Sequence, residues 1–471
     1  MRKTCGIYID TLGCFKNAED SERAAGLLAE AGYAIVGSPD DADVILVNTC
    51  GFIEAAKRES IDRVLEMIPH RETGKKLIVS GCLTQRYPKE LLAELPEADI
   101  VMGVNDYGKL PGIVAELLRD QTPRAGTRSN AGLADPPGAC PRNAARDRGD
   151  SGGRLFVNGK ETLLLGPRRA LSPRASALLK VAEGCDNRCS YCAIPYIRGA
   201  YRSVPMELLV AETERLAREG AKEIVLIAQD VSAYGSDVYG RYALPELLSR
   251  LCAVEGPEWF RLMYCYEERI TRELIEVMAR EPKICAYIDI PLQHCADGIL
   301  TRMNRRSRRA DIDRTLAALR DGVPDLAIRT TLMTGFPGET DEDFAALEDF
   351  VEENRFERLG VFAYSAEDGT PAADMPDKPS AELSEERKER LMLRQLDISL
   401  ENNRNLVGKT LRVLTEGTEE PGIYAGRTQF DAPEIDNAVL FTSGKPLRAG
   451  DMVNVTITDA MDYDIVGEIA D

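Results

Sequence analysis

Three cysteines lie close together in the stretch EGCDNRCSYC, residues 183–192: Cys185, Cys189 and Cys192. The spacing C-x-x-x-C-x-x-C offers three thiolates, whereas a tetrahedral metal ion takes four ligands. A zinc ribbon would need a second C-x-x-C pair, and the sequence has none. Three thiolates without a nearby histidine suit an iron–sulfur cluster better than zinc, and a four-iron cluster held by three cysteines keeps one iron open. A structural zinc site is the alternative.

Three other cysteines are spread along the first part of the chain; we call them the first cysteine set, and those of residues 183–192 the second. Cys14, Cys50 and Cys82 each follow a short apolar run that predicts a β-strand. The carboxyl ends of parallel strands meet at one crevice of an open α/β sheet, so we expect these thiols to meet in space. Small buried cysteines with no role are the alternative. The other cysteines lack ligand spacing and are interpreted as structural, with one in a linker: Cys5, Cys140, Cys252, Cys265, Cys285 and Cys295.

The elements that must position these cysteines are predicted by alternating strand-like and helical patterns, which indicate a mixed α/β fold. Residues 1–120 predict an open parallel α/β domain. Residues 177–400 hold six strand–helix units, which predict a partial (βα)6 barrel of the TIM type. The cysteines of 183–192 follow its first strand, at the rim where such barrels carry their chemistry. Residues 405–471 predict a small all-β barrel of OB-like size.

The segment 121–176 interrupts this pattern. It is rich in Gly and Pro and carries more basic than acidic residues inside an acidic chain, which predicts a linker. The run VNGKETLLL within it predicts a short hairpin.

Composition restricts the class of protein. No apolar run approaches the roughly 20 residues of a membrane span, and the first residues lack the apolar region of a signal peptide, so we expect a cytoplasmic protein without a membrane partner. Thiols stay reduced there, which favours metal binding or catalysis over disulfides. The net charge of −19 argues against a broad nucleic-acid surface and suits a basic protein partner.

Other residues at the barrel rim are candidates for cofactor contacts. Gln293 and His294 end the fourth barrel strand, and a structural role is favoured for the histidine. The turn GFPGET, which starts at Gly335, follows the fifth strand and could shape a cofactor pocket. Tyr191 precedes Cys192, the last cysteine of the second set, where it could pack on an adenine or elsewhere in the core.

With these motifs in place, the chain resembles the radical S-adenosylmethionine methylthiotransferase family over nearly its whole length. TLGCFKNAEDSE, VNTCGFIEAAK and SGCLTQRY resemble the amino-terminal domain of that family, and the carboxy-terminal barrel resembles a TRAM domain. The resemblance implies that Cys185, Cys189 and Cys192 hold one [4Fe-4S] cluster, which binds S-adenosylmethionine. It implies that Cys14, Cys50 and Cys82 hold an auxiliary [4Fe-4S] cluster, which carries the incoming sulfur. It further implies that Tyr191 lies beside the cofactor, with a protein reductant supplying single electrons.

Two positions depart from the superfamily pattern. AQD, residues 228–230, stands where many members have Gly-Gly-Glu, so Gln229 is the candidate there for contact with the cofactor. Glu267 stands where relatives commonly have proline, and the sequence gives it no role.

Within the family, one class modifies an adenosine of tRNA and the other an aspartate of the twelfth small-subunit ribosomal protein. AEGCDNRCSYCAIPYIRG, IAQDVSAYG, RLMYCY, IPLQH and GRTQFDAPEIDN resemble the second class. Residues 405–471 carry 12 acidic and 5 basic residues, which would repel tRNA and attract a basic ribosomal protein, free or in the ribosome. The prediction is therefore an enzyme that adds a methylthio group to the aspartate β-carbon. A tRNA adenosine methylthiotransferase and a non-catalytic iron–sulfur carrier or translation-associated binding protein are the alternatives.

Overall fold

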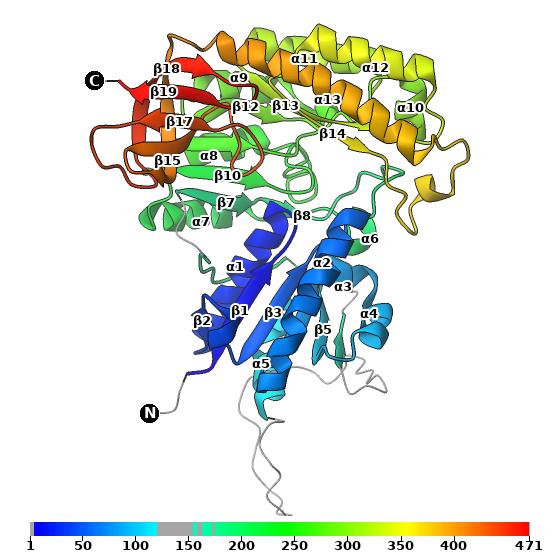
Figure 1. The fold of residues 1–471 in the computed structure, drawn as a ribbon, viewed down its shortest axis with the longest axis vertical. Coiled ribbons are helices and arrows are strands. Elements are labelled where there is room, and N and C mark those ends of the chain that lie inside the picture. Colours follow the sequence, from blue (N-terminus) through cyan, green and yellow to red (C-terminus); the bar gives the residue numbers. More distant parts are fainter. Residues whose placement is uncertain (1–3, 120–153, 158–162, 172–174, 471) are drawn as a thin grey trace, which may run out of the picture. The chain divides into compact units, whose positions relative to one another are not determined.

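The computed structural model describes residues 4–119, 154–157, 163–171 and 175–470. The chain divides into two compact units (Figure 1). The first comprises Met1–Leu171 and Tyr196–Arg198, and the second comprises Ser172–Pro195 and Gly199–Asp471. The barrel core and the C-terminal barrel, predicted as separate domains, therefore belong to one compact unit.

The first unit is built on a six-stranded parallel sheet with the order β2-β1-β3-β4-β5-β6. Every residue of the central strand β3 is buried, as the apolar run VILV at its start predicts. The strands are β1 (Gly6–Thr11), β2 (Ala34–Val36), β3 (Val44–Thr49), β4 (Lys76–Gly81), β5 (Ile100–Gly103) and β6 (Arg154–Phe156). The α-helices are α1 (Phe15–Glu30), α2 (Glu54–Met67), α3 (Cys82–Arg86), α4 (Pro88–Glu94) and α5 (Leu110–Arg119). The open parallel α/β domain is confirmed.

The sheet extends into the segment predicted to be a linker, and this is a difference from the sequence interpretation. Strand β6 pairs with β5, and its first amide donates to the carbonyl of Asp99 at 3.2 Å. Further on, Arg168 Nε donates to Glu22 of α1 at 2.6 Å. Short chain segments can join a sheet edge through backbone hydrogen bonds alone, whatever their composition. Part of the hairpin predicted for VNGKETLLL lies outside the described residues.

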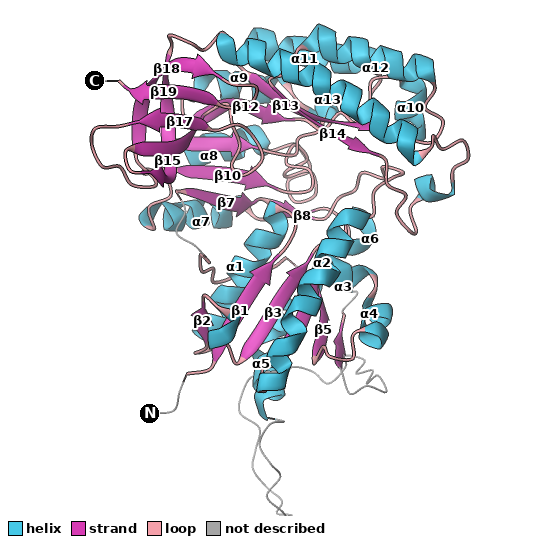
Figure 2. Cartoon of the chain, viewed as in Figure 1, coloured by secondary structure: helices cyan, strands magenta, loops and turns pink. Residues whose placement is uncertain are grey.

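The second unit contains the six parallel strands of the predicted partial barrel, in the order β14-β13-β12-β11-β10-β7. The strands are β7 (Ser176–Lys180), β10 (Glu223–Ile227), β11 (Trp259–Leu262), β12 (Ile284–Asp289), β13 (Ala327–Thr334) and β14 (Arg358–Ala363). The helices are α7 (Met206–Arg218), α8 (Leu244–Cys252), α9 (Arg272–Arg280), α10 (Asp297–Arg302), α11 (Arg309–Gly322), α12 (Asp341–Asn354) and α13 (Ala381–Arg404). The (βα)6 prediction is confirmed, because strand and helix alternate through the core (Figure 2).

The C-terminal strands form a closed five-stranded barrel, as predicted, with the order β15-β16-β17-β19-β18. The strands are β15 (Thr410–Glu420), β16 (Ile423–Thr428), β17 (Val439–Thr442), β18 (Met452–Ala460) and β19 (Ile465–Ile469). Alternate residues of these strands point inward and build a small apolar core around Val413, Val439 and Phe441.

Buried ion pairs join this barrel to the first residues of the core strands. Glu223 at the start of β10 binds Arg427 of β16 at 2.7 Å. Arg358 at the start of β14 binds Asp431 at 2.8 Å through Nε. Arg427 and Asp431, the partners on the side of the C-terminal barrel, both lie in GRTQFDAPEIDN. This motif therefore forms the joint between the two barrels of the second unit.

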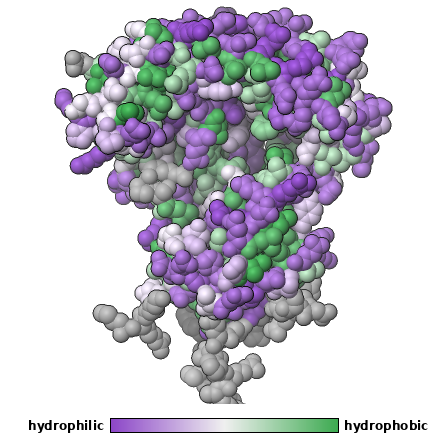
Figure 3. Space-filling model, in the orientation of Figure 1, coloured by the Kyte–Doolittle hydropathy of each residue, from purple (hydrophilic) through white to green (hydrophobic). Residues whose placement is uncertain are grey.

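The outer helices of the second unit are covered by charged side chains. Arg390 and Arg394 of α13 pair with Glu348 and Glu352 of α12 at 2.6 and 3.1 Å. The space-filling view in Figure 3 shows a mainly hydrophilic surface over these helices. Within the part of the chain that the structure describes, no helix combines the length and apolar character needed to cross a membrane.

Candidate functional site

The cysteines of the first set lie at the carboxyl ends of three adjacent strands. Cys50 and Cys82 directly follow β3 and β4, and Cys14 follows β1 by three residues and caps the amino terminus of α1. The strand order places β1, β3 and β4 side by side. The sequence predicted this shared edge of the sheet, and the structure brings the three cysteines to it.

One side chain of α1 ties these three strand ends together. Asn17 Nδ2 donates to the carbonyls of Leu12, at 2.8 Å, and Thr49, at 3.2 Å. Its Oδ1 accepts a hydrogen bond from the Cys82 thiol at 3.5 Å. Because Asn17 is completely buried, these bonds fix the strand ends that carry the cysteines relative to one another.

The backbone around the cysteines is tightly packed. Gly13 has φ +90°, and a Cβ added there would lie 2.7 Å from Cys50 Cβ and 2.9 Å from Cys50 Sγ. Ser60 of α2 holds the other side of Cys50, accepting from its amide at 2.9 Å and donating to its carbonyl at 3.0 Å. Position 13 therefore needs glycine both for its conformation and for the space that the cysteine occupies.

Burial dominates the electrostatics of this set. It raises the pKa of Cys82 to about 12, and the guanidinium of Arg198 opposes that rise, while Cys14 and Cys50 add to it. Burial likewise raises the pKa of Cys50. The mutual electrostatic influence means that the three thiols share one environment. Thiols in such a place ionise when they bind a metal, because the metal supplies the missing positive charge.

The second set lies at the carboxyl end of β7, the first strand of the core. Cys185 follows the short strand β8 (Ala182–Glu183), and its amide donates to the carbonyl of Gly199 at 3.0 Å. Cys185 and Cys189 are each 5% exposed, and burial raises the pKa of Cys185 to about 12. The position at the barrel rim agrees with the sequence prediction.

The loop that carries these cysteines is anchored by the motif AQD. Asn187 Nδ2 donates to Asp230 at 2.8 Å, and Arg269 bonds both residues at 2.9 Å. Next to it, Gln229 Nε2 donates to Glu183 at 2.8 Å, and the buried Gln229 Oε1 has no hydrogen-bond partner among the described residues. Asp230 thus positions the cysteine loop. Gln229 Oε1 is an acceptor that a bound ligand could use.

An aromatic side chain links the cysteine loop to a buried ion pair. The Tyr266 hydroxyl lies 3.5 Å from Cys189 Sγ, and the guanidinium of Arg305 lies 4.4 Å from the centroid of the Tyr266 ring. Arg305 in turn binds Glu267 at 2.7 Å, with side chains 3% and 2% exposed. Glu267, to which the sequence analysis gave no role, is therefore the counterion of Arg305, the buried arginine that packs on Tyr266 next to Cys189.

A small cavity opens beside this group of residues. It has a volume of about 180 Å³ and is lined by residues of the cysteine loop and of two other segments: Asp186, Asn187, Arg188, Cys189, Tyr266, Glu268, Asn304, Arg305 and Arg306. It is polar, and Cys189 is the one cysteine among the residues that line it.

Tyr191 and the GFPGET turn meet in the structure. The Tyr191 ring packs edge-on against Phe336, with centroids 6.3 Å apart. Gly335 has φ +71°, and a Cβ there would lie 1.8 Å from Ser384 Oγ. Tyr191 thus borders an apolar cluster at the rim, and it is partly exposed.

Gln293 and His294 have different roles. Gln293, four residues after the end of β12, adopts φ +71°, a costly conformation for a residue other than glycine that is often found at functional sites. His294 is completely buried; its Nδ1 accepts from the amide of Ala296 at 3.0 Å, and its Nε2 lies 3.6 Å from Glu339. The histidine is held inside the fold, as the structural interpretation predicted.

The donor chemistry of both sets fits an iron–sulfur cluster. Each offers three thiols, and in each at least two are buried and out of water. None of the cysteines in the described ranges is in a disulfide. Over those same ranges, no group of three or more Cys, His, Asp or Glu is arranged to hold a single metal ion. Cluster cysteines bind separate irons, so they need not converge on one point as the ligands of a zinc ion do.

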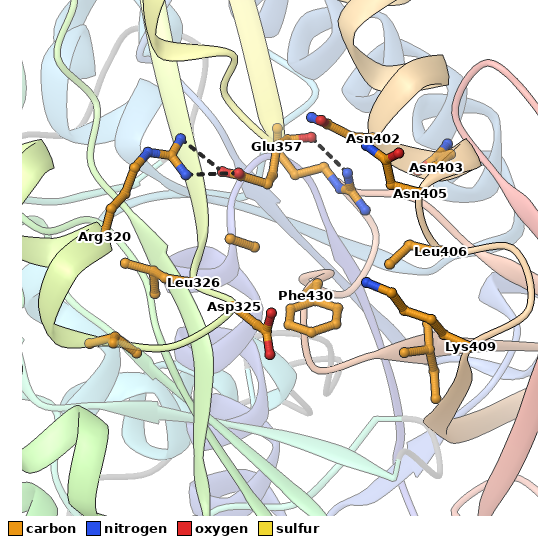
Figure 4. Close-up of a pocket in the computed structure, with 14 residues that line it drawn as sticks. Arg320, Asp325, Leu326, Glu357, Asn402, Asn403, Asn405, Leu406, Lys409 and Phe430 are labelled. Atoms are coloured by element: carbon orange, nitrogen blue, oxygen red, sulfur yellow. Dashed lines mark hydrogen bonds and ion pairs between the residues drawn. The ribbon is translucent and has the colours of Figure 1, made fainter.

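A larger cavity lies elsewhere in the second unit (Figure 4). It has a volume of about 370 Å³ and is lined by residues near the starts of β13 and β14, the end of α13 and Phe430. Arg320 and Glu357 on its wall form an ion pair at 2.9 Å. It contains none of the predicted site residues and lies at the amino ends of the core strands, where such barrels rarely carry their chemistry.

Several side chains around the two sets were not found from the sequence. Asn17 follows Cys14 by three residues, which is one helical turn, and that spacing was the available signal. Arg198 and Arg305 carried no signal, because their partners lie far away in sequence.

Three family models match parts of the chain. Residues 6–103 match the uncharacterized protein family UPF0004, residues 179–351 match the radical SAM superfamily, and residues 407–470 match the TRAM domain. The structure also resembles that of the radical S-adenosylmethionine methyltransferase TsrM from Kitasatospora setae with cobalamin and a [4Fe-4S] cluster bound. The TM-score is 0.54 and the identity 13%, over 90% of this chain and 80% of that chain. This likeness concerns the fold.

Curated relatives match along the entire chain. The ribosomal protein uS12 methylthiotransferase RimO of Desulforamulus reducens is 44% identical over 98% of this chain and 99% of its own. RimO of Pelobacter propionicus is 46% identical over 98% of this chain and 97% of its own. RimO of Clostridioides difficile is 43% identical, over 98% of both chains. With its two cysteine sets at the expected strand ends, the chain belongs to the RimO family of radical SAM methylthiotransferases.

Proposed function

We propose that this enzyme adds a methylthio group to the β-carbon of an aspartate in ribosomal protein uS12. The observation that carries the proposal is the near-complete alignment with relatives named uS12 methylthiotransferase, at 44% identity in a chain of matching length. The alignment includes the parts of the chain that match the UPF0004, radical SAM and TRAM models.

In this proposal, each cysteine set holds one [4Fe-4S] cluster: Cys185, Cys189 and Cys192 at the barrel rim, and Cys14, Cys50 and Cys82 in the first unit. When bound, these clusters and S-adenosylmethionine would supply the one-electron chemistry and the methylated sulfur that an unactivated C–H bond requires. The open coordination position in each set follows from the count of three thiols.

The residues of the chain have the tasks of holding, orienting and charge balancing. Asn187, Asp230 and Arg269 fix the cysteine loop at the rim. Gln229 offers a buried acceptor, and Tyr191 with Phe336 offers an apolar edge, which suit the polar and aromatic ends of S-adenosylmethionine. Cys185 and Cys189 are buried, and exclusion of water from such a site would protect a reactive carbon centre from side reactions.

The charge of the C-terminal barrel supports a basic protein substrate. Residues 405–471 carry 12 acidic and 5 basic residues, and Glu419 and Glu420 are exposed on β15. Such a surface attracts a basic protein and repels the phosphates of RNA. A one-electron reductant is required as a second partner.

The experiment is anaerobic reconstitution with iron and sulfide, followed by incubation with S-adenosylmethionine, a reductant and either uS12 or tRNA. Mass spectrometry should find one methylthio group on an aspartate of uS12 and none on tRNA. Modification of tRNA alone would show that tRNA, and not uS12, is the substrate. Absence of 5′-deoxyadenosine would show that the protein is an iron–sulfur carrier or binding protein instead.

A further inference from the structure

Arg198 places a buried positive charge against the first cysteine set. It is the last residue of α6 (Ile194–Arg198), and by its contacts it belongs to the first unit together with Tyr196 and Ile197. Its side chain is 3% exposed. Its Nη2 donates to Cys82 Sγ at 3.2 Å, so the guanidinium contacts a predicted cluster ligand directly.

Two side chains of α1 hold the guanidinium in this place. Asp20 accepts from Nη1 at 2.7 Å, and the carboxylate is itself 3% exposed. Asn17 Oδ1 accepts from Nη2 at 2.7 Å. Since Asn17 also bonds the Cys82 thiol and the strand ends before Cys14 and Cys50, the arginine is fixed to the same framework as the cysteines.

A fixed cation at this distance acts on any cluster that Cys82 holds. A hydrogen bond to a ligand sulfur and a neighbouring positive charge both favour the more negatively charged, reduced state of a cluster, and they raise its reduction potential. The effect is large in a buried site, because little water is present to screen it. Asp20 binds the guanidinium and not the sulfur, and its negative charge offsets part of the positive charge of Arg198.

We propose that Arg198 is a positioning residue of the auxiliary cluster, where its guanidinium holds Cys82 and raises the reduction potential of the cluster, with Asp20 as the opposing charge. The inference deepens the proposed function and rests on it, because it requires that Cys14, Cys50 and Cys82 bind a cluster. It assigns a separate role to a residue that lies six positions after Cys192 in sequence.

The test uses the full chain with Cys185, Cys189 and Cys192 replaced by alanine, so that one cluster remains. Iron content and the reduction potential, followed by EPR, are measured after reconstitution. Arg198→Gln should shift the reduction potential to a more negative value. Arg198→Lys keeps the positive charge and should have a reduction potential close to that of the parent. Asp20→Asn should shift it in the opposite direction, since the guanidinium is then uncompensated. A purely structural role would not give shifts of opposite sign.

Arg23→Gln is the matched control, because Arg23 is also a buried arginine of the first unit but binds Glu19 and the carbonyl of Gly166. It should leave the potential unchanged. If Arg198→Gln does not fold, the opposite shift in Asp20→Asn still tests the inference. Equal potentials in all variants with full iron would overturn this inference alone. A triple-alanine protein that binds no iron would overturn the auxiliary cluster of the proposed function, and the inference with it.

Discussion

Glu223 and Arg427 are 204 residues apart in sequence and form a buried ion pair of 2.7 Å between the core and the C-terminal barrel. Arg261 binds the same carboxylate at 2.7 Å from the neighbouring strand. Burial by itself would raise the pKa of Glu223, but the two guanidiniums outweigh it and lower the pKa to about 2. At this point of the joint between the barrels, one carboxylate is therefore shared between an arginine of the core and an arginine of the C-terminal barrel.

Glu223→Gln should lower the free energy of unfolding by about 3 to 5 kcal/mol, because the buried Arg261 loses its counterion and the buried Arg427 keeps only its pair with the partly exposed Glu416. The pair also predicts a pH dependence. A folded pKa below the usual value of 4.5 gives stability that is complete above about pH 4.5 and is lost as the pH falls toward 2. Urea unfolding at several pH values should show this loss in the parent protein and a smaller one in the variant.

Glu258→Gln is the control for that prediction. It removes a pair with Arg412, which joins the same two barrels but is 55% exposed on the arginine side. Exposed pairs contribute little, so the variant should lose less than about 1 kcal/mol. Equal losses in the two variants would contradict the importance of the buried joint.

Glu267→Pro should destabilise the protein even though the backbone can accept proline. Glu267 begins a short 3-10 helix, a position that suits proline, but the substitution leaves Arg305 buried without its counterion. Arg305→Met in addition should recover much of the loss. Thermal melting of the parent, both single variants and the double variant measures the coupling; additive losses would show that the pair is not coupled.

Serine at any one of the six candidate cysteines should remove about half of the bound iron and abolish methylthio transfer, because each set would hold one of two clusters of equal iron content. Cys252→Ser and Cys285→Ser are the controls, since both cysteines are buried outside the two sets. Iron and sulfide assays measure the loss of cluster, and mass spectrometry of uS12 measures the loss of methylthio transfer. An active Cys82→Ser variant would refute the three-ligand set of the first unit.

Gly13→Ala should weaken the first cysteine set more than Gly32→Ala. Both glycines have φ +90°, so both substitutions cost roughly 1 to 2 kcal/mol of backbone strain. Only at Gly13 does the new Cβ meet Cys50; at Gly32 nothing lies within 4 Å. Iron content after reconstitution should fall in the first variant and not in the second. Similar iron content in both would mean that Cys50 can move without consequence.

Reversing the charge of Glu419 and Glu420 to lysine should weaken binding of uS12, and the difference from the parent should shrink at high salt. Glu386→Lys with Glu389→Lys, on the exposed side of α13, makes the same change of net charge elsewhere. Fluorescence anisotropy with labelled uS12 gives both affinities. If both double variants bind alike, net charge and not the barrel surface attracts the substrate.

The sequence by itself determined the parts of the fold that are encoded locally. Apolar runs and helical periods predicted both parallel sheets and the closed barrel, because each strand or helix carries its own pattern of burial. Strand ends then located Cys14, Cys50 and Cys82, since side chains that follow adjacent parallel strands must share one edge. The spacing of Cys185, Cys189 and Cys192 was likewise local.

Only the tertiary structure decided which side chains that are distant in sequence meet. Arg198 beside Cys82, Arg305 beside Glu267 and Arg427 beside Glu223 are pairs of residues separated by 116, 38 and 204 positions, and no periodicity connects them. The edge strand β6 was missed for a related reason: backbone hydrogen bonds place it on the sheet, and its composition resembles a linker. A buried charge is specified by where its counterion lies in space, and the linear pattern carries no record of that distance.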